Sequence, residues 1–461
     1  MRAEAKALGA SFRDPSGFMF RANGNLYRQV NESYADQYRA LMESGLYEAL
    51  VAKGVLVSHE EASIDGARDS AAHKILKPAL IPFISYPYEW SFSELKQAAL
   101  LTLEIQEMAL ARGMVLKDAS AYNVQFLGSK PIFIDTLSFE KYVEGTPWVA
   151  YQQFCQHFLA PLALMSFCDV RLAKLLKEFI NGVPLDLTSS LLPMSTWLKP
   201  GIVMHVHLHA RSQNRHADDA RKGSTTARRM SLTGLRGLID HLKSVVSALT
   251  WKPGGTEWAD YYEGTNYNDT ARSEKANKVA EYIAAVAPHM VWDFGANNGE
   301  FSKLAAERGA YTVAFDIDAS AVEKNYLREQ SQHSTRMLPL ILDLTNPSPN
   351  MGWAHEERLS TAGRGPADLA LALALVHHLA ISNNVPLDRV SRYFASCCKA
   401  LVIEFVPKED SQVIRLLASR KDVFPHYTQA DFEAAFSEDF VIERSHRITD
   451  SHRTLYLMRK K

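Results

Sequence analysis

One segment in the C-terminal half combines an acid, glycines and a helix start at a chemically useful spacing. Residues 291–302 read VWDFGANNGEFS and place Asp293, Gly295 and Gly299 in the pattern D-x-G-x-x-x-G. Glycines at a strand-to-helix turn let a ligand approach the backbone, and the helix N-terminus offers unpaired N–H groups to an anion. The segment predicts a site for a nucleotide-type cofactor.

Two further acids follow apolar runs downstream. Asp316 ends the run 311–316, and Asp343 follows the run 338–342. Acids at the carboxyl ends of parallel strands can accept hydrogen bonds from ribose hydroxyls, although such acids are also common caps. Because the two follow a Gly-rich turn in order, we expect all three acids in one site.

The elements that must position these acids alternate between strand and helix. Such alternation predicts an α/β fold with a doubly wound, Rossmann-like sheet. The expected parallel strands cover 291–294, 311–316, 338–342, 368–375 and 400–405, and the expected final antiparallel hairpin covers 440–444 and 454–458.

This order resembles the class I S-adenosylmethionine-dependent methyltransferases over residues 258–461. The resemblance implies S-adenosylmethionine as cofactor. Asp293, Gly295 and Gly299 would then receive its methionine part, Asp316 its ribose and Asp343 its adenine. Asn297, within the same motif, is a further candidate for cofactor contact. The pattern does not fit G-x-G-x-x-G, which disfavours a nicotinamide dehydrogenase.

Two upstream residues are further candidates for cofactor contact. Tyr267 belongs to an aromatic stretch before the first strand, a position that often closes over the cofactor in this family. Lys275 could reach the cofactor carboxylate or could equally be a solvated lysine on an amphipathic helix.

Methyl transfer to oxygen or nitrogen needs alignment and a group that removes a proton. His377 and His378 follow the fourth expected strand, and an imidazole titrates near neutrality. Only one of two adjacent histidines can face the site. Glu404, at the end of the fifth strand, is a third candidate catalytic residue. No metal site is expected there.

The N-terminal half carries a second pattern of acids. A helix expected at 96–112 is followed by Asp118 and Asn123 in D-x-x-x-x-N, then by a hairpin and Asp135. This resembles protein kinases and aminoglycoside phosphotransferases, where these positions supply the base and two magnesium ligands. The implied N-terminal fold is an α+β kinase-like domain. A turn capped by chance by Asp118 and Asn123 is the alternative.

The departures from that pattern favour a degenerate domain that binds or scaffolds. No His-Arg precedes Asp118, no Gly-rich phosphate loop is present, and Arg28 is the nearest cation to the usual lysine position. The hairpin-like stretch 17–30 could supply the first two strands. A bifunctional kinase–methyltransferase and a non-catalytic cofactor-binding scaffold remain alternatives.

Between the halves the composition becomes basic. Residues 199–243 hold nine Lys and Arg against three Asp, which predicts an exposed linker, with contact to an anionic acceptor or nucleic acid as the less favoured interpretation. We therefore expect domains at 1–200 and 251–461 with a basic linker at 201–250. The histidines of 204–209, MHVHLH, would share one face only in an extended strand, and we expect no metal there.

Composition limits the remaining classes. The chain has 461 residues, 47% hydrophobic content and a formal net charge of -1, so whole-chain charge gives no argument for nucleic acid or an anionic membrane. No apolar run is long enough for a membrane span, and four scattered cysteines suggest a reducing, cytoplasmic location. The acceptor stays open among sugar or polysaccharide, small metabolite, RNA and protein.

Overall fold

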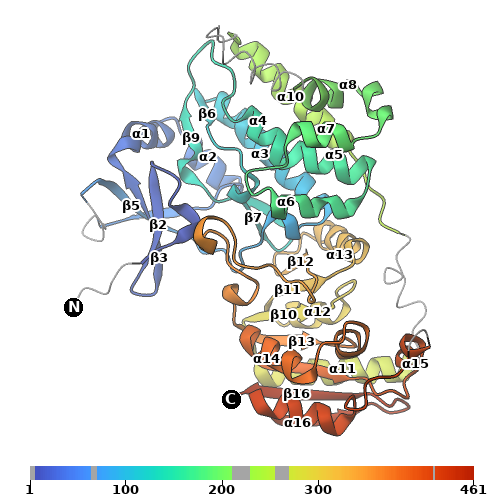
Figure 1. The fold of residues 1–461 in the computed structure, drawn as a ribbon. Helices are drawn as coiled ribbons and strands as arrows, with labels where there is room; N and C mark the ends of the chain where they lie inside the picture. The colour runs from blue at the N-terminus through green and yellow to red at the C-terminus, as the bar shows by residue number, and fades with distance from the viewer. Residues whose placement is uncertain (1–5, 64–69, 210–228, 255–268, 419–420) are drawn as a thin grey trace. The chain divides into compact units, whose positions relative to one another are not determined.

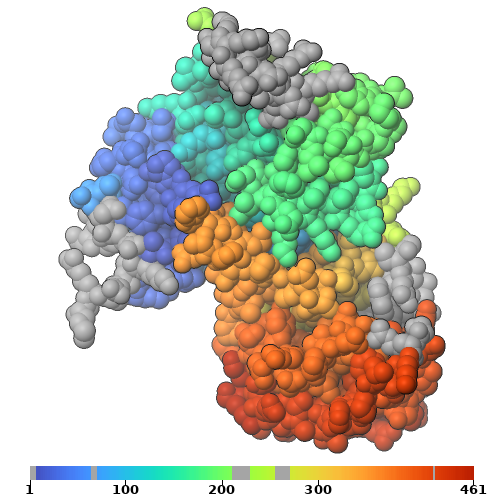
Figure 2. Space-filling view, in the orientation of Figure 1, coloured from blue at the N-terminus to red at the C-terminus, as the bar shows by residue number. Residues whose placement is uncertain are grey.

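The computed structural model describes residues 6–63, 70–209, 229–254, 269–418 and 421–461 (Figure 1). Figure 2 shows the surface of the chain coloured by residue number. The chain divides into two compact units. The first comprises Met1–Phe126, Pro131–Lys252 and Gly352–Arg358, and the second comprises Leu127–Lys130, Pro253–Met351 and Leu359–Lys461.

A seven-stranded sheet forms the centre of the second unit, in the order β12-β11-β10-β13-β14-β16-β15. The first five strands in that order are parallel, and β16 runs antiparallel between β14 and β15. The predicted doubly wound sheet and its final hairpin are confirmed. The strands are β10 (Met290–Phe294), β11 (Tyr311–Asp316), β12 (Met337–Ile341), β13 (Ala367–Ala372), β14 (Cys398–Phe405), β15 (Phe440–Arg447) and β16 (Thr454–Lys460).

Helices cover both faces of this sheet, because alternate residues of a strand point to opposite sides. Val291 packs in one cluster with Val279 and Ile283 of α11, whereas the ring of Phe294 lies 5.6 Å from that of Phe394 on α14. The helical segments are α11 (Asp269–Val286), α12 (Glu300–Ala306), α13 (Ala319–Ser331), η13 (Ala362–Arg364), η14 (His378–Ser382), α14 (Leu387–Cys397), α15 (Ser411–Leu417) and α16 (Gln429–Asp439). Burial on both faces explains the continuous apolar runs in the sequence.

The first unit begins with a five-stranded sheet in the order β1-β2-β3-β5-β4, with antiparallel neighbours. The expected hairpin at 17–30 is β2 and β3, joined at Asn23 and Gly24, which both have positive φ as a tight hairpin turn requires. The elements are β1 (Lys6–Ala7), η1 (Gly9–Ser11), β2 (Gly17–Ala22), β3 (Asn25–Asn31), η2 (Glu32–Tyr34), α1 (Ala35–Glu43), α2 (Leu46–Ala52), β4 (His59–Ala62) and β5 (Ala72–Pro78).

A long helix and two strand pairs follow. The helix expected at 96–112 is α3 (Phe92–Leu110), which starts earlier because Ser91 and Glu94 form a capping box. Next, β6 (Met114–Leu116) pairs with β9 (Phe139–Lys141), and β7 (Val124–Leu127) pairs with β8 (Lys130–Phe133). The loop with Asp118 and Asn123 therefore connects β6 to β7, and Asp135 follows β8.

The rest of the first unit is helical. It contains η4 (Pro87–Glu89), η5 (Ala121–Asn123), η6 (Thr136–Ser138), α4 (Tyr151–Phe154), η7 (Cys155–Leu159), α5 (Ala160–Phe167), η8 (Val170–Lys174), α6 (Leu175–Glu178), α7 (Leu185–Leu191), η9 (Met194–Leu198), α8 (Pro200–Ile202), η10 (Val203–His207), α10 (Leu232–Ala248) and η12 (Trp353–His355).

The stretch we expected as a linker is partly helical. Its helix α10 buries Leu235, Ile239, Leu242 and Val246, which recur at helical spacing. That stripe belongs to a core, and the excess of basic residues hid it in the sequence. Residues 210–228, the centre of the basic stretch, lie outside the described residues.

The three histidines of the MHVHLH stretch do not share one extended face. His205 and His207 lie on the π-helix η10. His205 hydrogen-bonds Tyr151 at 2.7 Å and His241 at 2.9 Å, while His207 contacts Ser189 and is stacked on a tryptophan ring. Within the described ranges no group of three or more His, Cys, Asp or Glu is arranged to hold a metal ion.

Candidate active site

The turn from β10 to α12 has a left-handed backbone conformation at both of its glycines. Gly295 and Gly299 have φ of 73° and 79°, and Asn297 between them also has positive φ. At Gly299 a Cβ atom would lie 2.5 Å from the Nδ2 atom of Asn325. A side chain at position 299 would therefore push the Asn325 side chain aside and strain the turn, because φ there is positive.

Two of the three strand-end acids lie beside this turn, buried. Asp293 accepts a hydrogen bond from Ser302 at 2.6 Å, and burial raises the pKa of Asp293 to about 7. Asp316 accepts from the backbone N–H groups of Asn297 at 2.7 Å and Asp318 at 2.8 Å. Burial raises the pKa of Asp316 to about 6, against these hydrogen bonds.

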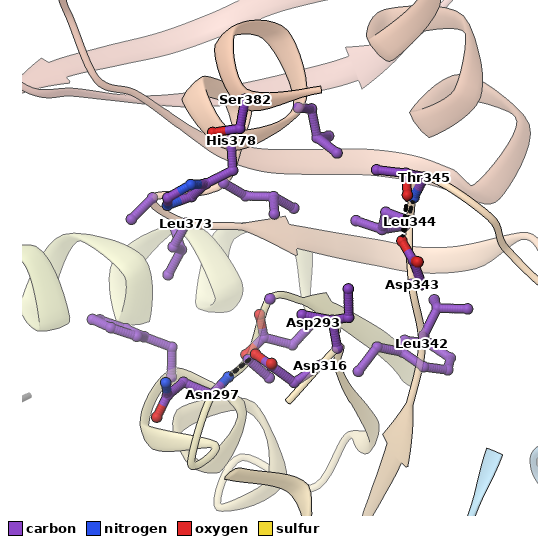
Figure 3. Close-up of a pocket in the computed structure, with 18 of the residues that line it drawn as sticks. Asp293, Asn297, Asp316, Leu342, Asp343, Leu344, Thr345, Leu373, His378 and Ser382 are labelled. Atoms are coloured by element: carbon purple, nitrogen blue, oxygen red, sulfur yellow. Dashed lines mark hydrogen bonds between the residues drawn. The ribbon is translucent and has the colours of Figure 1, made fainter. Parts of the chain in front are cut away.

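The third acid lines the same pocket. Asp343 follows β12 and accepts two hydrogen bonds from Thr345, at 2.9 Å from its backbone and 2.6 Å from its hydroxyl. All three acids line one pocket of about 350 Å³ at the carboxyl ends of the parallel strands. Figure 3 shows Asp293 and Asp316 on one side of it and His378 and Ser382 on the other.

The two histidines after β13 have different places. His378 lines the pocket, whereas His377 is fully buried, and within the described residues neither of its ring nitrogens has a hydrogen-bond partner. Burial and the charge of Arg453 lower the pKa of His378 to about 4, and burial lowers the pKa of His377 well below its usual value. Both imidazoles are therefore neutral at pH 7.

Glu404 lies behind the pocket and is not among the residues that line it. Its carboxylate binds Lys275 at 2.7 Å, and both side chains are buried. Lys275 itself lines the pocket, so the solvated-lysine alternative does not describe it. Tyr267 lies outside the described residues, and its role stays a prediction.

Three residues that we did not predict also line the pocket, namely Arg453, Phe301 and Ser382. Arg453 stands in a polar stretch just before the last strand, TDSHRT, and its two hydrogen bonds to Asp410 bridge 43 residues. No local sequence pattern indicates that Arg453 lines the pocket. Phe301 could have been predicted as a lining residue, because it lies in the first turn of the helix that follows the glycine turn.

The three kinase-like positions of the first unit also lie close together. Asp135 forms an ion pair with Arg28 at 2.6 Å, and Arg28 also binds Asp14 at 3.2 Å. Burial, and next the charge of Asp135, raise the pKa of Asp118. Asn123 donates to Ser138, which also donates to Asp135. One acid of this site is therefore already paired with a cation.

The second unit is thus a doubly wound α/β unit with an acid-lined pocket at its strand ends. Over 455 residues the chain is 38% identical to the nodulation protein NoeA of Rhizobium meliloti (strain 1021), and the match covers 97% of this chain and 95% of that protein. The chain therefore belongs to the family of this nodulation protein. No protein-family model matches it.

Some solved methyltransferase structures match part of the chain at low similarity. The magnesium protoporphyrin IX methyltransferase of Synechocystis PCC 6803 with bound SAH is 18% identical, covers 44% of this chain and 93% of its own, and has a TM-score of 0.32. The N-methyltransferase NodS from Bradyrhizobium japonicum WM9 is 11% identical over 42% of this chain and 98% of its own, also at 0.32.

No helix in the described part of the chain has both the length and the apolar character to cross a membrane.

Proposed function

We propose that the second unit is an S-adenosylmethionine-dependent methyltransferase. The observation that carries the proposal is the convergence of Asp293, Asp316 and Asp343 on one pocket beside a glycine turn. Strand-end carboxylates suit the ribose hydroxyls of a nucleoside, and the mainly apolar remainder of the lining suits a purine ring.

In this proposal each acid meets a different part of the cofactor. Asp316 accepts hydrogen bonds from the ribose, Asp343 lies near the adenine, and Asp293 with Gly295 meets the methionine part. Asn297 and Gly299 hold the turn. When bound, the cofactor supplies an electrophilic methyl group on a sulfonium, so the protein must align the acceptor and manage its proton.

His378 is our candidate for the residue that manages the acceptor proton. Of the three catalytic candidates it alone lines the pocket. Its imidazole is neutral and has a free base form, but its lowered pKa makes it a weaker base than an ordinary histidine. His377 is buried away from the pocket, and the carboxylate of Glu404 is bound to Lys275. The acceptor class stays open.

For the first unit we propose a kinase-like binding module that assists acceptor recognition. The order of α3, β6, the Asp118 loop, the β7–β8 pair, Asp135 and β9 supports the kinase-like part. The ion pair between Arg28 and Asp135 supports the binding role, because a carboxylate that already neutralises an arginine is a poor ligand for magnesium.

Calorimetric titration separates these proposals. S-adenosylhomocysteine should bind the purified protein, while ATP with magnesium should not. Binding of both, with magnesium-dependent ATP turnover, would favour a bifunctional kinase–methyltransferase. Binding of S-adenosylhomocysteine without methyl transfer to any acceptor pool would favour a scaffold. Binding of neither would overturn the methyltransferase proposal.

A further inference from the structure

A row of buried charges lies behind the pocket, and the proposed function leaves it unexplained. Glu404 ends in a carboxylate with no exposure to solvent. One of its oxygens, Oε2, accepts a hydrogen bond from the ammonium of Lys275 at 2.7 Å and from the backbone N–H of Ala374 at 2.8 Å. Since these residues belong to β14, to α11 and to the loop after β13, one oxygen atom joins three parts of the unit.

The bond to Ala374 supports an unusual backbone conformation. Ala374 has a φ of 49°, a left-handed conformation that residues with a Cβ atom rarely adopt and that persists only where the surroundings enforce it. Its neighbours Leu373 and Leu375 both line the pocket. The carboxylate of Glu404 therefore helps to fix the position of one pocket wall.

The bond to Lys275 keeps a positive charge at the edge of the pocket. The ammonium lies 4.9 Å from the centre of the Phe301 ring, and burial is the main cause that lowers the pKa of Lys275. A buried ammonium is costly unless a carboxylate is close. The charged and titratable groups that face Lys275 from the other elements are Glu404, Arg453, Glu300, Asp293 and His377.

Among these groups Glu404 is the main support of the lysine charge. Its attraction and its hydrogen bond both oppose the effect of burial, whereas Arg453 acts with burial. Arg453 is held by Asp410 at 2.7 Å and stays 3.9 Å from Glu404. The charge of Lys275 thus depends mainly on a carboxylate 129 residues away in the chain.

We propose that Glu404 is a positioning residue, which holds Lys275 charged toward the carboxylate of the cofactor and fixes the pocket wall through Ala374. This inference rests on the proposed function. It gives Glu404 a task other than proton removal from the acceptor.

Two substitutions separate the two bonds. Glu404→Gln keeps an oxygen acceptor for Ala374 but removes the negative charge, and Glu404→Leu removes both. Calorimetric titration with S-adenosylhomocysteine between pH 6.5 and 9.5, each variant compared with wild type at the same pH, should show Glu404→Gln binding roughly tenfold more weakly at neutral pH. The deficit should grow as the pH rises, because the unpaired Lys275 loses its proton. Glu404→Leu should bind more weakly still.

Matched variants control this test. Lys275→Met should weaken binding without the added pH dependence, and Glu443→Gln, which breaks an exposed pair with Arg459, should match wild type. Wild-type protein that binds no S-adenosylhomocysteine would overturn the proposed function and this inference with it. Wild-type binding together with equal binding by Glu404→Gln at every pH would overturn the inference alone.

A measurement on the wild type keeps the inference testable where the variants fail to fold. Reductive methylation followed by mass spectrometry should modify Lys275 more slowly when S-adenosylhomocysteine is present, while the exposed Lys399 reacts at an unchanged rate. A rate at Lys275 that does not respond to the ligand would overturn the inference.

Discussion

Both units place acids directly after strands or in the loops between them, but the acids that we compare have different partners. In the second unit Asp316 accepts hydrogen bonds from the backbone N–H groups of Asn297 and Asp318. In the first unit Asp135 is bound by the guanidinium of Arg28. The comparison teaches that the spacing of acids identifies a site, while the partner of each acid decides what the site can still bind.

The largest effect that we expect is on the rate of methyl transfer, and it concerns His378, which lies opposite the pocket acids. His378→Ala should lower methyl transfer about a hundredfold, since general-base catalysis contributes roughly that much or more. The measurement is incorporation of labelled methyl from S-adenosylmethionine into a cell extract that contains the acceptor. Affinity for S-adenosylhomocysteine should stay near wild type, and full transfer by the variant would move the assignment to His377 or Glu404.

The next prediction concerns Asp316, the pocket acid held by backbone N–H groups. Asp316→Ala should weaken S-adenosylhomocysteine binding at least about tenfold, or roughly 1.4 kcal/mol, because the ribose loses its charged acceptor. Calorimetry measures it, and Asp388→Ala, which alters an exposed acid on α14, serves as control. Unchanged affinity in a folded Asp316→Ala protein would remove Asp316 from the site.

A smaller effect follows from the raised pKa values of two pocket acids. Asp316 with a pKa of about 6 and Asp293 with a pKa of about 7 are both protonated at pH 5 and both ionised at pH 8. Because the ionised form is the better hydrogen-bond acceptor, affinity for S-adenosylhomocysteine should rise several-fold from pH 5 to pH 8. A flat profile would show that neither carboxyl meets the ligand.

The last prediction concerns stability rather than ligand binding, and it sharpens the contrast with the paired acid. Asp135→Asn should lower the free energy of unfolding by about 1–3 kcal/mol, since the mostly buried Arg28 loses a charged partner and keeps only Asp14. Urea denaturation measures this change. Binding of S-adenosylhomocysteine should not respond, and a large loss of that binding would contradict separate sites.

The strand-end acids could be predicted from the sequence because their cause is local. Asp293, Asp316 and Asp343 each end an apolar run, and parallel strands bring their carboxyl ends to one edge. The hairpin of β15 and β16 was equally readable. These features can be predicted from the spacing of the apolar residues and from the glycines at the turn alone.

Other features depend on contacts between distant parts of the chain. His378 lines the pocket from the start of the π-helix η14, and no residue pattern in the sequence indicates this helix. The bond between Glu404 and Lys275 spans 129 residues, so the local sequence around one residue does not predict its pairing with the other. The apolar stripe of α10 was locally readable, but the basic residues around it led us to expect a linker.

The long separation of Lys275 and Glu404 also bears on how the unit folds and unfolds. Contacts between residues far apart in the chain close large loops and are costly to form early. We therefore expect this buried pair to form after the transition state of folding. Interactions that form so late mainly slow unfolding. The charges that hold the pocket wall should then act chiefly on the lifetime of the native state, rather than on the speed with which it is reached.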